Sequence, residues 1–462
     1  MKGIRFYLAL FAARLSRRLL RLMGRQGSHT PGDIARRIDR DFLKKLDKPR
    51  HIVCVTGTNG KTTVSNMISD SLTKMGVSHA RNTYGSNLEQ GVIVSLLASA
   101  DWLGRSKVEY GLFEVDEIAS RTIFPALSPQ LIAVTNLYRD SYRRNAHTDY
   151  IVSFLNEAIP ESARLILNAD DLISAQVAPK NERRYFSLPR LPDEPEEKSA
   201  IINDLSLCPV CSGPLQFTFQ RYHHLGQAVC DGCGLTNPEP DYALTDVSAD
   251  GVAILEKKDD LAHRYPRIGA RIVEMYNELT AVTILRELGF KPDAIARSLD
   301  GVKVTESRYK ETVIGEKRML VMLGKDQNPI ATTRALADIG QLKDAKSAAV
   351  LLINQVVDNE FSSENIAWIY DVNFDYLNQP FIKRIGNGSP RYKDFEQRML
   401  LAGIPPEKIV GAVDEETLAK SIDISDVDVI VLITGTKNKP GVAKAEAAMV
   451  ERLIALAEPT AV

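Results

Sequence analysis

The chain has 462 residues and a formal net charge of −1 at pH 7, with 44% hydrophobic and 25% charged residues. A chain of this length is too long for one hydrophobic core, so two or three domains are expected. A net charge near zero gives no overall attraction to nucleic acid, so no nucleic-acid partner is expected. Binding partners must therefore be sought in local sequence patterns.

The first 25 residues combine basic and apolar side chains and contain no acidic residue. Their longest apolar run, residues 6–13, is far shorter than the roughly 20 residues that span a bilayer, and no small-residue cleavage site follows it. We therefore expect a cytoplasmic protein without a transmembrane helix, in which residues 1–48 form a basic helical arm. A basic amphipathic helix can lie on the inner membrane surface; alternatively, it can dock on its own domain with its arginines outward.

From His51 onward, short apolar segments alternate with amphipathic ones. Residues 51–55 are predicted to be a strand, which a glycine turn connects to an amphipathic helix over about residues 61–75. Further strands are predicted at residues 110–115, 131–135 and 165–168. This alternation indicates an α/β sheet, and in such open sheets ligands bind at the carboxyl ends of the strands.

The alternation breaks at residues 186–200, which are rich in Pro, Glu and Lys and are predicted to be an exposed linker. Helices are predicted at residues 271–288 and 292–299, and a domain boundary near Thr305. Alternation then restarts, with strands predicted at residues 318–323, 347–353, 409–413 and 427–433. We expect a central ATP-binding domain at residues 49–305 and a separate Rossmann-like domain at residues 306–462.

A contracted phosphate-binding loop, TGTNGKTT, occupies residues 56–63 between the first predicted strand and helix. Backbone N–H groups of such a turn point at phosphate oxygens, and the helix N-terminus adds its positive dipole end. Lys61 would neutralise the β- and γ-phosphates, and the Thr62 hydroxyl would bind Mg²⁺. The candidate ATP-binding residues of the loop are Gly57, Thr58, Asn59, Gly60, Lys61, Thr62 and Thr63.

The contracted loop resembles that of the Mur ligase family, ATP-dependent enzymes that build the peptidoglycan stem peptide. Residues 82–88, 113–117, 135–140 and 167–171 resemble in particular the MurT group, the synthetase subunits of lipid II isoglutaminyl synthase. The resemblance implies a Mur-ligase-type central domain. It also places Asn87 and Asn277 at the nucleotide, Asn277 near the adenine, and suggests that Arg308 reaches ATP.

The same resemblance makes Glu114 a ligand of Mg²⁺ or a neighbour of its ligands. A carboxylate at a strand end beside a triphosphate is costly without a cation, which favours this role. An ordinary surface ion pair is the alternative. With Lys61 and Thr62, Glu114 completes the set of expected catalytic residues of this chain's loop region.

Four cysteines have zinc-ribbon spacing: Cys208 and Cys211 form one pair, and Cys230 and Cys233 form the other. Four thiolates on two tight turns can enclose Zn²⁺ tetrahedrally, which predicts a structural zinc ribbon at residues 205–242 within the central domain. Disulfides are the alternative, and the absence of a secretory signal argues against them. The neighbouring His223 and His224 are expected to pack rather than to bind the metal.

The resemblance implies a function: ATP-dependent amidation of the D-glutamate α-carboxylate of the lipid II stem peptide to D-isoglutamine, through an acyl phosphate. Ammonia would come from a separate GatD-like glutaminase subunit. A glutaminase needs a nucleophilic thiolate, and outside the ribbon only Cys54 remains, inside a predicted strand. The chain is therefore expected to need that partner.

Three departures from the MurT pattern keep other functions open. Asn365 stands where the family has an aspartate that completes a Cys-His-Asp arrangement with the glutaminase. Residues 141–147 and 433–437 also differ. One alternative is a MurT paralogue that joins a different carboxylate and amine; another is a non-catalytic ATP-binding scaffold.

Overall fold

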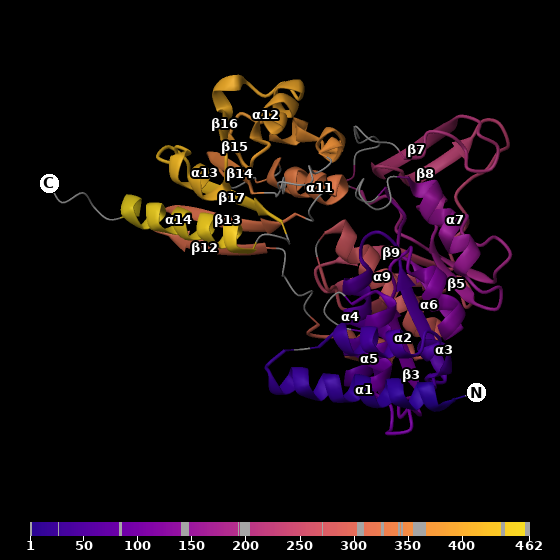
Figure 1. The fold of residues 1–462 in the computed structure, drawn as a ribbon. Helices are drawn as coiled ribbons and strands as arrows, with labels where there is room; N and C mark the ends of the chain where they lie inside the picture. Colours follow the sequence, from indigo (N-terminus) through magenta and orange to yellow (C-terminus); the bar gives the residue numbers. More distant parts are fainter. Residues whose placement is uncertain are drawn as a thin grey trace. The chain divides into compact units, whose positions relative to one another are not determined.

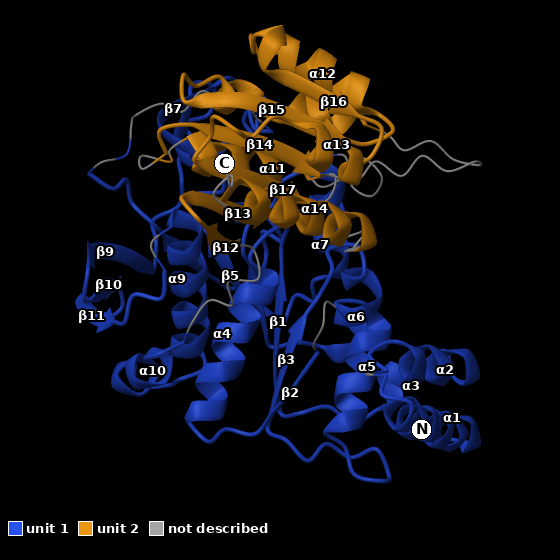
Figure 2. Cartoon of the chain, turned by 90° about the vertical axis from the view of Figure 1, so that its left-hand side faces the viewer, with its two compact units in different colours: residues 1–139, 147–199, 203–304 blue, residues 140–146, 200–202, 305–462 orange. Residues whose placement is uncertain are grey.

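The computed structural model describes the chain except residues 1, 26, 83–85, 140–146, 193, 195–203, 270, 303–308, 325–327, 341, 343–344, 354–365, 436–438 and 458–462. Two expected site residues, Arg308 and Asn365, lie outside the described residues. The chain forms two compact units (Figure 2). Unit 1 comprises residues 1–139, 147–199 and 203–304, and unit 2 comprises residues 140–146, 200–202 and 305–462.

A mixed sheet of nine described strands forms the centre of unit 1, in the order β11-β10-β9-β6-β5-β4-β1-β3-β2. The strands from β9 to β2 are parallel to their neighbours, whereas β9, β10 and β11 pair antiparallel. The strands are β1 (His51–Thr56), β2 (His79–Arg81), β3 (Tyr110–Glu114), β4 (Leu131–Val134), β5 (Arg164–Asn168), β6 (Arg183–Ser187), β9 (Tyr242–Ser248), β10 (Gly251–Glu256) and β11 (Leu261–Tyr265).

Helices cover both faces of this sheet (Figure 2). The helices α4, α9 and α10 pack on one another on one face, while α5, α6 and α7 cover the other. The first three helices pack beside α5 and α6, and their buried residues join the core of that second face. The helices of unit 1 are α1 (Ile4–Leu22), α2 (Thr30–Ile38), α3 (Phe42–Lys45), α4 (Lys61–Lys74), α5 (Glu89–Ala98), α6 (Ser120–Leu127), α7 (Thr148–Ala158), α8 (Leu172–Ala175), α9 (Ile272–Glu287) and α10 (Pro292–Leu299).

The strands coincide with short apolar runs in the sequence. A strand that is covered on both faces must be apolar at nearly every position. In β1, Ile52 and Cys54 face the helices α1, α5 and α6, and every residue after His51 is buried. Cys54 is fully buried, and burial raises the pKa of its thiol, so it is no nucleophile.

The linker predicted at residues 186–200 starts later in the structure than the sequence indicated. Phe186 and Ser187 belong to β6, which pairs with both β5 and β9, and Leu188 is also buried. Aromatic residues are common in strands, and β6 contains a tyrosine and a phenylalanine. The prolines and acidic residues that follow β6 caused the predicted linker to begin before the strand ends.

The inserted hairpin consists of β7 (Leu215–Tyr222) and β8 (Leu225–Cys230), which form a separate two-stranded antiparallel sheet. The turn between them contains His223, whose φ of 50° is left-handed. This hairpin carries Cys230 at the end of β8, and Cys208 and Cys211 lie just before β7.

Unit 2 is a second α/β unit with a sheet of six described strands, in the order β12-β13-β17-β14-β15-β16. All neighbours are parallel except β12 and β13. Its strands are β12 (Tyr309–Ile314), β13 (Lys317–Leu323), β14 (Ala348–Ile353), β15 (Ile382–Gly388), β16 (Ile409–Ala412) and β17 (Val429–Thr434). Its helices are α11 (Pro329–Gly340), α12 (Tyr392–Leu401), α13 (Glu415–Ser421) and α14 (Lys439–Ala457), with short 3₁₀ turns η1 (Ala367–Asp371), η2 (Phe374–Leu377) and η3 (Pro406–Lys408) (Figure 1).

Apolar side chains of β14 and β17 are buried on both faces of the unit 2 sheet, in two separate clusters. Trp368 of η1 belongs to one of these clusters and packs edge-on against Phe395, with ring centroids 6.0 Å apart. Among the described residues of both units, no helix combines the length and the apolar character needed to cross a membrane.

Candidate nucleotide site and cysteine cluster

The phosphate-binding loop connects the end of β1 to the start of α4, and two glycines give it its shape. Gly57 and Gly60 have φ angles of 120° and 90°, which L side chains rarely adopt. A Cβ atom at Gly57 would lie 2.4 Å from Oγ1 of Thr135, and one at Gly60 would lie 2.3 Å from Oδ1 of Asn277. Both positions therefore require glycine for conformation and for space.

The segment after β4 forms a wall for this loop. The backbone N–H of Thr58 donates to the Asn136 carbonyl oxygen at 2.8 Å, and that of Asn59 donates to Asn136 Oδ1 at 3.0 Å. Oγ1 of Thr135 donates to the Asn59 carbonyl oxygen at 2.6 Å. Asn136 thus fixes two consecutive loop residues, a role that its place in the sequence did not reveal.

Lys61 is the first residue of α4, and its amine is buried against a carboxylate. Nζ donates to Glu117 Oε1 at 2.8 Å and to the carbonyl oxygen of Gly57. Burial lowers the pKa of Lys61, but the charge of Glu117, together with those of Glu114 and Asp116, outweighs burial and raises it. The amine therefore stays protonated, as a phosphate-binding lysine must.

Thr62 and Glu114, predicted as a magnesium-binding pair, lie together. The Thr62 hydroxyl donates to Glu114 Oε2 at 2.8 Å. Asn82 accepts from the Glu114 N–H at 2.9 Å and donates to its carbonyl oxygen at 2.7 Å, which fixes the end of β3. With Asp116 and Glu117 nearby, carboxylates outnumber the amine of Lys61, so this corner suits a divalent cation held by oxygen ligands.

The other expected loop residues lie around this corner. Thr63 is half-buried in the first turn of α4. The Nδ2 atom of Asn59 is buried and has no hydrogen-bond partner among the described residues, so it suits an acceptor on a ligand. Asn87 contributes its carbonyl oxygen to the Asp116 N–H at 3.0 Å, which places it beside the carboxylate-bearing segment.

Asn277 lies on α9 with its carboxamide oxygen against the loop at Gly60. The next residue, Glu278, is fully buried; one of its oxygens accepts from the Ile268 N–H at 3.1 Å, and the other has no partner among the described residues. Burial raises the pKa of Glu278 to about 7. Three residues before Asn277, Glu274 caps α9 by accepting from the Arg271 N–H at 3.0 Å.

The four ribbon cysteines converge, with all Sγ atoms within 4.8 Å of one another. The Cys208 and Cys233 sulfurs lie 3.6 Å apart and those of Cys211 and Cys230 lie 3.4 Å apart, too far for disulfide bonds. Tetrahedral Zn²⁺ with sulfur at 2.3 Å needs sulfurs about 3.8 Å apart, so the spacing fits that ion. Neither His223 nor His224 belongs to this group.

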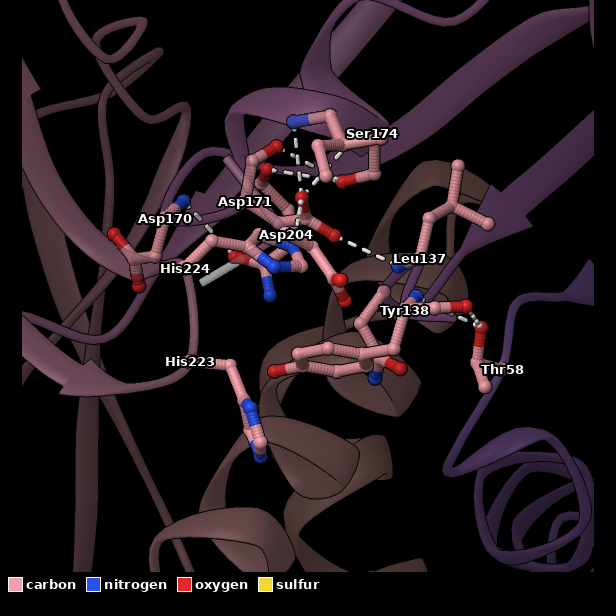
Figure 3. A network of polar contacts seen from close by, with 12 residues as sticks. Thr58, Leu137, Tyr138, Asp170, Asp171, Ser174, Asp204, His223 and His224 are labelled. Carbon is pink, nitrogen blue, oxygen red and sulfur yellow. Dashed lines mark hydrogen bonds and ion pairs between the residues drawn. The ribbon is translucent and has the colours of Figure 1, made fainter. Parts of the chain in front are cut away.

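The tip of the ribbon hairpin reaches the wall of the nucleotide loop through one aspartate (Figure 3). His224 is fully buried, and its Nε2 lies 3.1 Å from Asp171 Oδ1. The other oxygen of Asp171 accepts from the Leu137 N–H at 2.8 Å, and the Tyr138 N–H in turn donates to Thr58 Oγ1 at 2.9 Å. An unbroken chain of contacts thus leads from the ribbon to the loop.

A second network fixes the same end of the hairpin, next to its turn. Arg221 is buried and pairs with Glu194, at 2.7 Å from Nε to Oε1. It also donates to the Tyr276 hydroxyl at 2.6 Å, which donates to Asp170 Oδ2 at 2.7 Å. The neighbouring Gln227 of β8 donates to the other oxygen of Asp170 at 3.0 Å. The hairpin is therefore part of the core of unit 1.

Residues 55–189 match the family model of the Mur ligase middle domain, and residues 326–437 match that of the MurT ligase C-terminal domain. The fold is similar to a pseudomurein peptide ligase type C from Methanothermus fervidus, with a TM-score of 0.64 and 19% identity, covering 89% of this chain and 81% of that one. It is also similar to MurF from Acinetobacter baumannii, with a TM-score of 0.61 and 14% identity over 90% of this chain and 80% of that one. The two family matches and the phosphate-binding loop together make this chain an ATP-dependent ligase of the Mur type.

Sequence similarity to MurT extends over nearly the full length of the chain. The chain is 29% identical to subunit MurT of lipid II isoglutaminyl synthase (glutamine-hydrolyzing) from Streptococcus pneumoniae, over 91% of this chain and 92% of that protein. It is 27% identical to the Staphylococcus aureus subunit of the same name, over 93% of this chain and 95% of that protein. The sequence-based resemblance to MurT is confirmed.

Proposed function

We propose that this chain is the synthetase subunit of a lipid II amidating enzyme, in which ATP activates the D-glutamate α-carboxylate of the stem peptide as an acyl phosphate. Ammonia then displaces phosphate and leaves D-isoglutamine. The observation that carries the proposal is the group formed by Lys61, Thr62 and Glu114 at the loop, in a chain that is similar to MurT over nearly its whole length.

Several residues of the loop have a role in this proposal. Backbone N–H groups at residues 60–62 would bind phosphate oxygens, and Lys61, protonated and held by Glu117, would neutralise charge on the transferred group. The Thr62 hydroxyl and the Glu114 carboxylate would hold Mg²⁺. Bound there, Mg²⁺ would neutralise negative charge on the phosphates.

The cysteine cluster supports structural zinc as a further proposal. Four thiolates fill every position of a tetrahedral ion, so no open position remains for substrate. Zinc analysis of the purified full chain should give one ion per chain, and a Cys233→Ser variant should lose it. A metal-free wild-type chain would refute this part.

A separate GatD-like glutaminase is the proposed source of ammonia, because Cys54 is buried and inert. The chain would work in the cytoplasm at the inner membrane surface, where a lipid-linked substrate is exposed. The part of the chain proposed for membrane contact is α1.

Mass spectrometry of lipid II tests the proposal. The chain is incubated with lipid II, ATP, Mg²⁺ and ammonium, and then with glutamine and its candidate glutaminase instead of ammonium. Conversion of one carboxylate to an amide in both reactions supports the proposal. Amidation with ammonium alone would keep the ligase and remove that glutaminase. ATP turnover with another acceptor would favour a MurT paralogue, and ATP binding without turnover would favour a scaffold.

A further inference from the structure

Helix α1 carries two apolar stripes on opposite sides. Residues of the first stripe are buried against the rest of unit 1: they are Phe6, Ala9, Leu10 and Ala13. Phe6 stacks on Phe42, with ring centroids 5.1 Å apart. Its ring also lies close to Gly104, where an added Cβ atom would be 3.2 Å from Cζ of Phe6. This stripe packs the helix on its own domain.

The second stripe faces solvent. It consists of Ile4, Leu8, Phe11, Leu15, Leu19 and Leu22, all exposed. Exposed fractions reach 82% for Ile4, 70% for Phe11 and 84% for Leu22. At 100° per residue, these six positions fall within a sector about 80° wide, opposite the buried stripe. Docking of α1 on its own domain therefore explains only one of the two apolar stripes.

Arginines flank the exposed stripe. Helical spacing places Arg14, Arg18 and Arg21 along one side of it and Arg5 along the other. Arg14 donates to the carbonyl oxygens of Ala100 and Asp101, which fixes the helix to unit 1, while Arg5, Arg18 and Arg21 are exposed. The first acidic residue of the chain is Asp33, after the helix has ended.

We propose that the outer face of α1, defined by the six residues of the exposed stripe with Arg5, Arg18 and Arg21, docks on the surface of an anionic lipid bilayer. A solvent-exposed stripe of large aliphatic and aromatic side chains with arginines on both sides fits the boundary between acyl chains and anionic headgroups. The exposed stripe runs from Ile4 to Leu22, along the whole helix of about 28 Å, so the helix would lie in the plane of the surface. A protein partner would need an acidic apolar groove of similar length.

The choice of a membrane rests in part on the proposed function, since a lipid-linked substrate brings the enzyme to the bilayer. Membrane binding itself needs no substrate, so the two proposals can fail separately. In the proposed arrangement, α1 raises the concentration of the enzyme at the surface that holds its substrate, and the loop of unit 1 does the chemistry.

Vesicle flotation of the full chain tests this inference. Vesicles contain phosphatidylcholine alone or mixed with phosphatidylglycerol. We expect wild-type protein to float with the anionic vesicles, less so as salt is added. A Leu8→Gln/Phe11→Gln/Leu15→Gln variant should lose flotation. Loss of two cations in Arg18→Gln/Arg21→Gln should weaken it on the order of tenfold or more, because each basic residue near an anionic surface contributes severalfold.

Matched variants elsewhere on the surface control for nonspecific effects. Leu261, Leu401 and Val413 are also exposed apolar residues, so their triple change to Gln should leave flotation unchanged. Lys258→Gln/Lys383→Gln is the control for charge. Flotation that is equal for wild type and the α1 variants, or absent in both, would overturn the inference. So would a wild-type dimer in sedimentation that the α1 variant abolishes while vesicle binding persists.

A kinetic comparison adds a second readout. The apolar α1 variant should raise KM for lipid II in vesicles and leave KM for a water-soluble muropeptide unchanged. An equal rise for both substrates would mean that the substitutions disturb unit 1 rather than membrane docking, and would count against the inference.

Discussion

The amine of Lys61 lies 2.8 Å from a carboxylate oxygen of Glu117, and both side chains are almost completely buried. A buried charge that loses its partner is strongly destabilised. Glu117 therefore holds the phosphate-binding lysine protonated and in place before any nucleotide arrives, although it does not itself lie in the loop.

The first prediction concerns this pair. Glu117→Gln removes the charge that offsets burial of Lys61, so the pKa of the lysine should fall and ATP turnover should drop at least about tenfold. Glu109→Gln, at an exposed position before β3, is the matched control. Steady-state ATPase measurements with lipid II present check this, and unchanged turnover in Glu117→Gln would remove Glu117 from the account.

The second prediction concerns the magnesium corner. Thr62→Ala and Glu114→Gln should each raise the Mg²⁺ concentration needed for half-maximal activity, and the double variant should cost less than the two single effects combined, because the side chains contact each other. Thr62→Ser keeps the hydroxyl and should behave nearly as wild type. Additive effects in Mg²⁺ titrations would show that the two residues act separately.

The third prediction follows the contacts from the ribbon to the loop. His224→Gln weakens the hydrogen bond to Asp171, which anchors the Leu137 N–H, so the Thr58 side of the loop should loosen. Loss of a buried hydrogen bond to a charged group costs roughly 1.5 to 3 kcal/mol of stability. Calorimetry should show weaker ATP binding.

Zinc content and a surface histidine provide the controls for this prediction. The zinc content of His224→Gln should stay at the wild-type level, since the group that could hold the metal consists of four cysteines and does not include His224. His263→Gln, at a partly exposed position on β11, should change neither quantity. If His224→Gln bound ATP with wild-type affinity, the contacts from His224 through Asp171 to the loop would have no effect on nucleotide binding.

The fourth prediction is a pH dependence of stability. The pKa of Glu278 is about 7 because the carboxyl is buried. A carboxyl whose pKa is raised in the folded state binds its proton there more tightly than in the unfolded state, so its contribution to stability falls as pH rises from about 4.5 to 7. Between pH 5 and pH 8 this loss amounts to roughly 2 to 3 kcal/mol.

Glu278→Gln removes this titration. Relative to wild type, the variant should gain stability as pH increases, by that same amount, in urea unfolding measured at pH 5 and pH 8. Glu161→Gln, at an exposed position, should show no such trend. A constant difference in stability between Glu278→Gln and wild type at both pH values would contradict the raised pKa of the buried carboxyl.

Local sequence signals predicted most of the parallel sheet and the loop. The apolar run at residues 51–55, the two glycines of the loop and the amphipathic segment after Lys61 each specify their own conformation, and β1, the loop and α4 follow them closely. The pairs of cysteines likewise predicted their cluster, because two tight turns bring four thiolates together.

Contacts between distant segments were not predictable in the same way. Asn136, Glu117 and His224 follow ordinary strand or turn sequences, and nothing local shows that they meet the loop, Lys61 and Asp171. Their positions depend on the order of strands in the sheet and on where the hairpin docks. The exposed stripe of α1 was visible as a pattern, but which of its two apolar sides is buried required the structure.

Oxygen transferred from the substrate carboxylate to phosphate would reveal activation as an acyl phosphate. The α-carboxylate of the muropeptide is labelled with heavy oxygen, and the full chain is supplied with ATP, Mg²⁺ and ammonium. Activation as an acyl phosphate predicts that one labelled oxygen appears in inorganic phosphate for each amide formed, and that Lys61→Ala abolishes both products. Amide formation with unlabelled phosphate, or with release of AMP, would contradict the account.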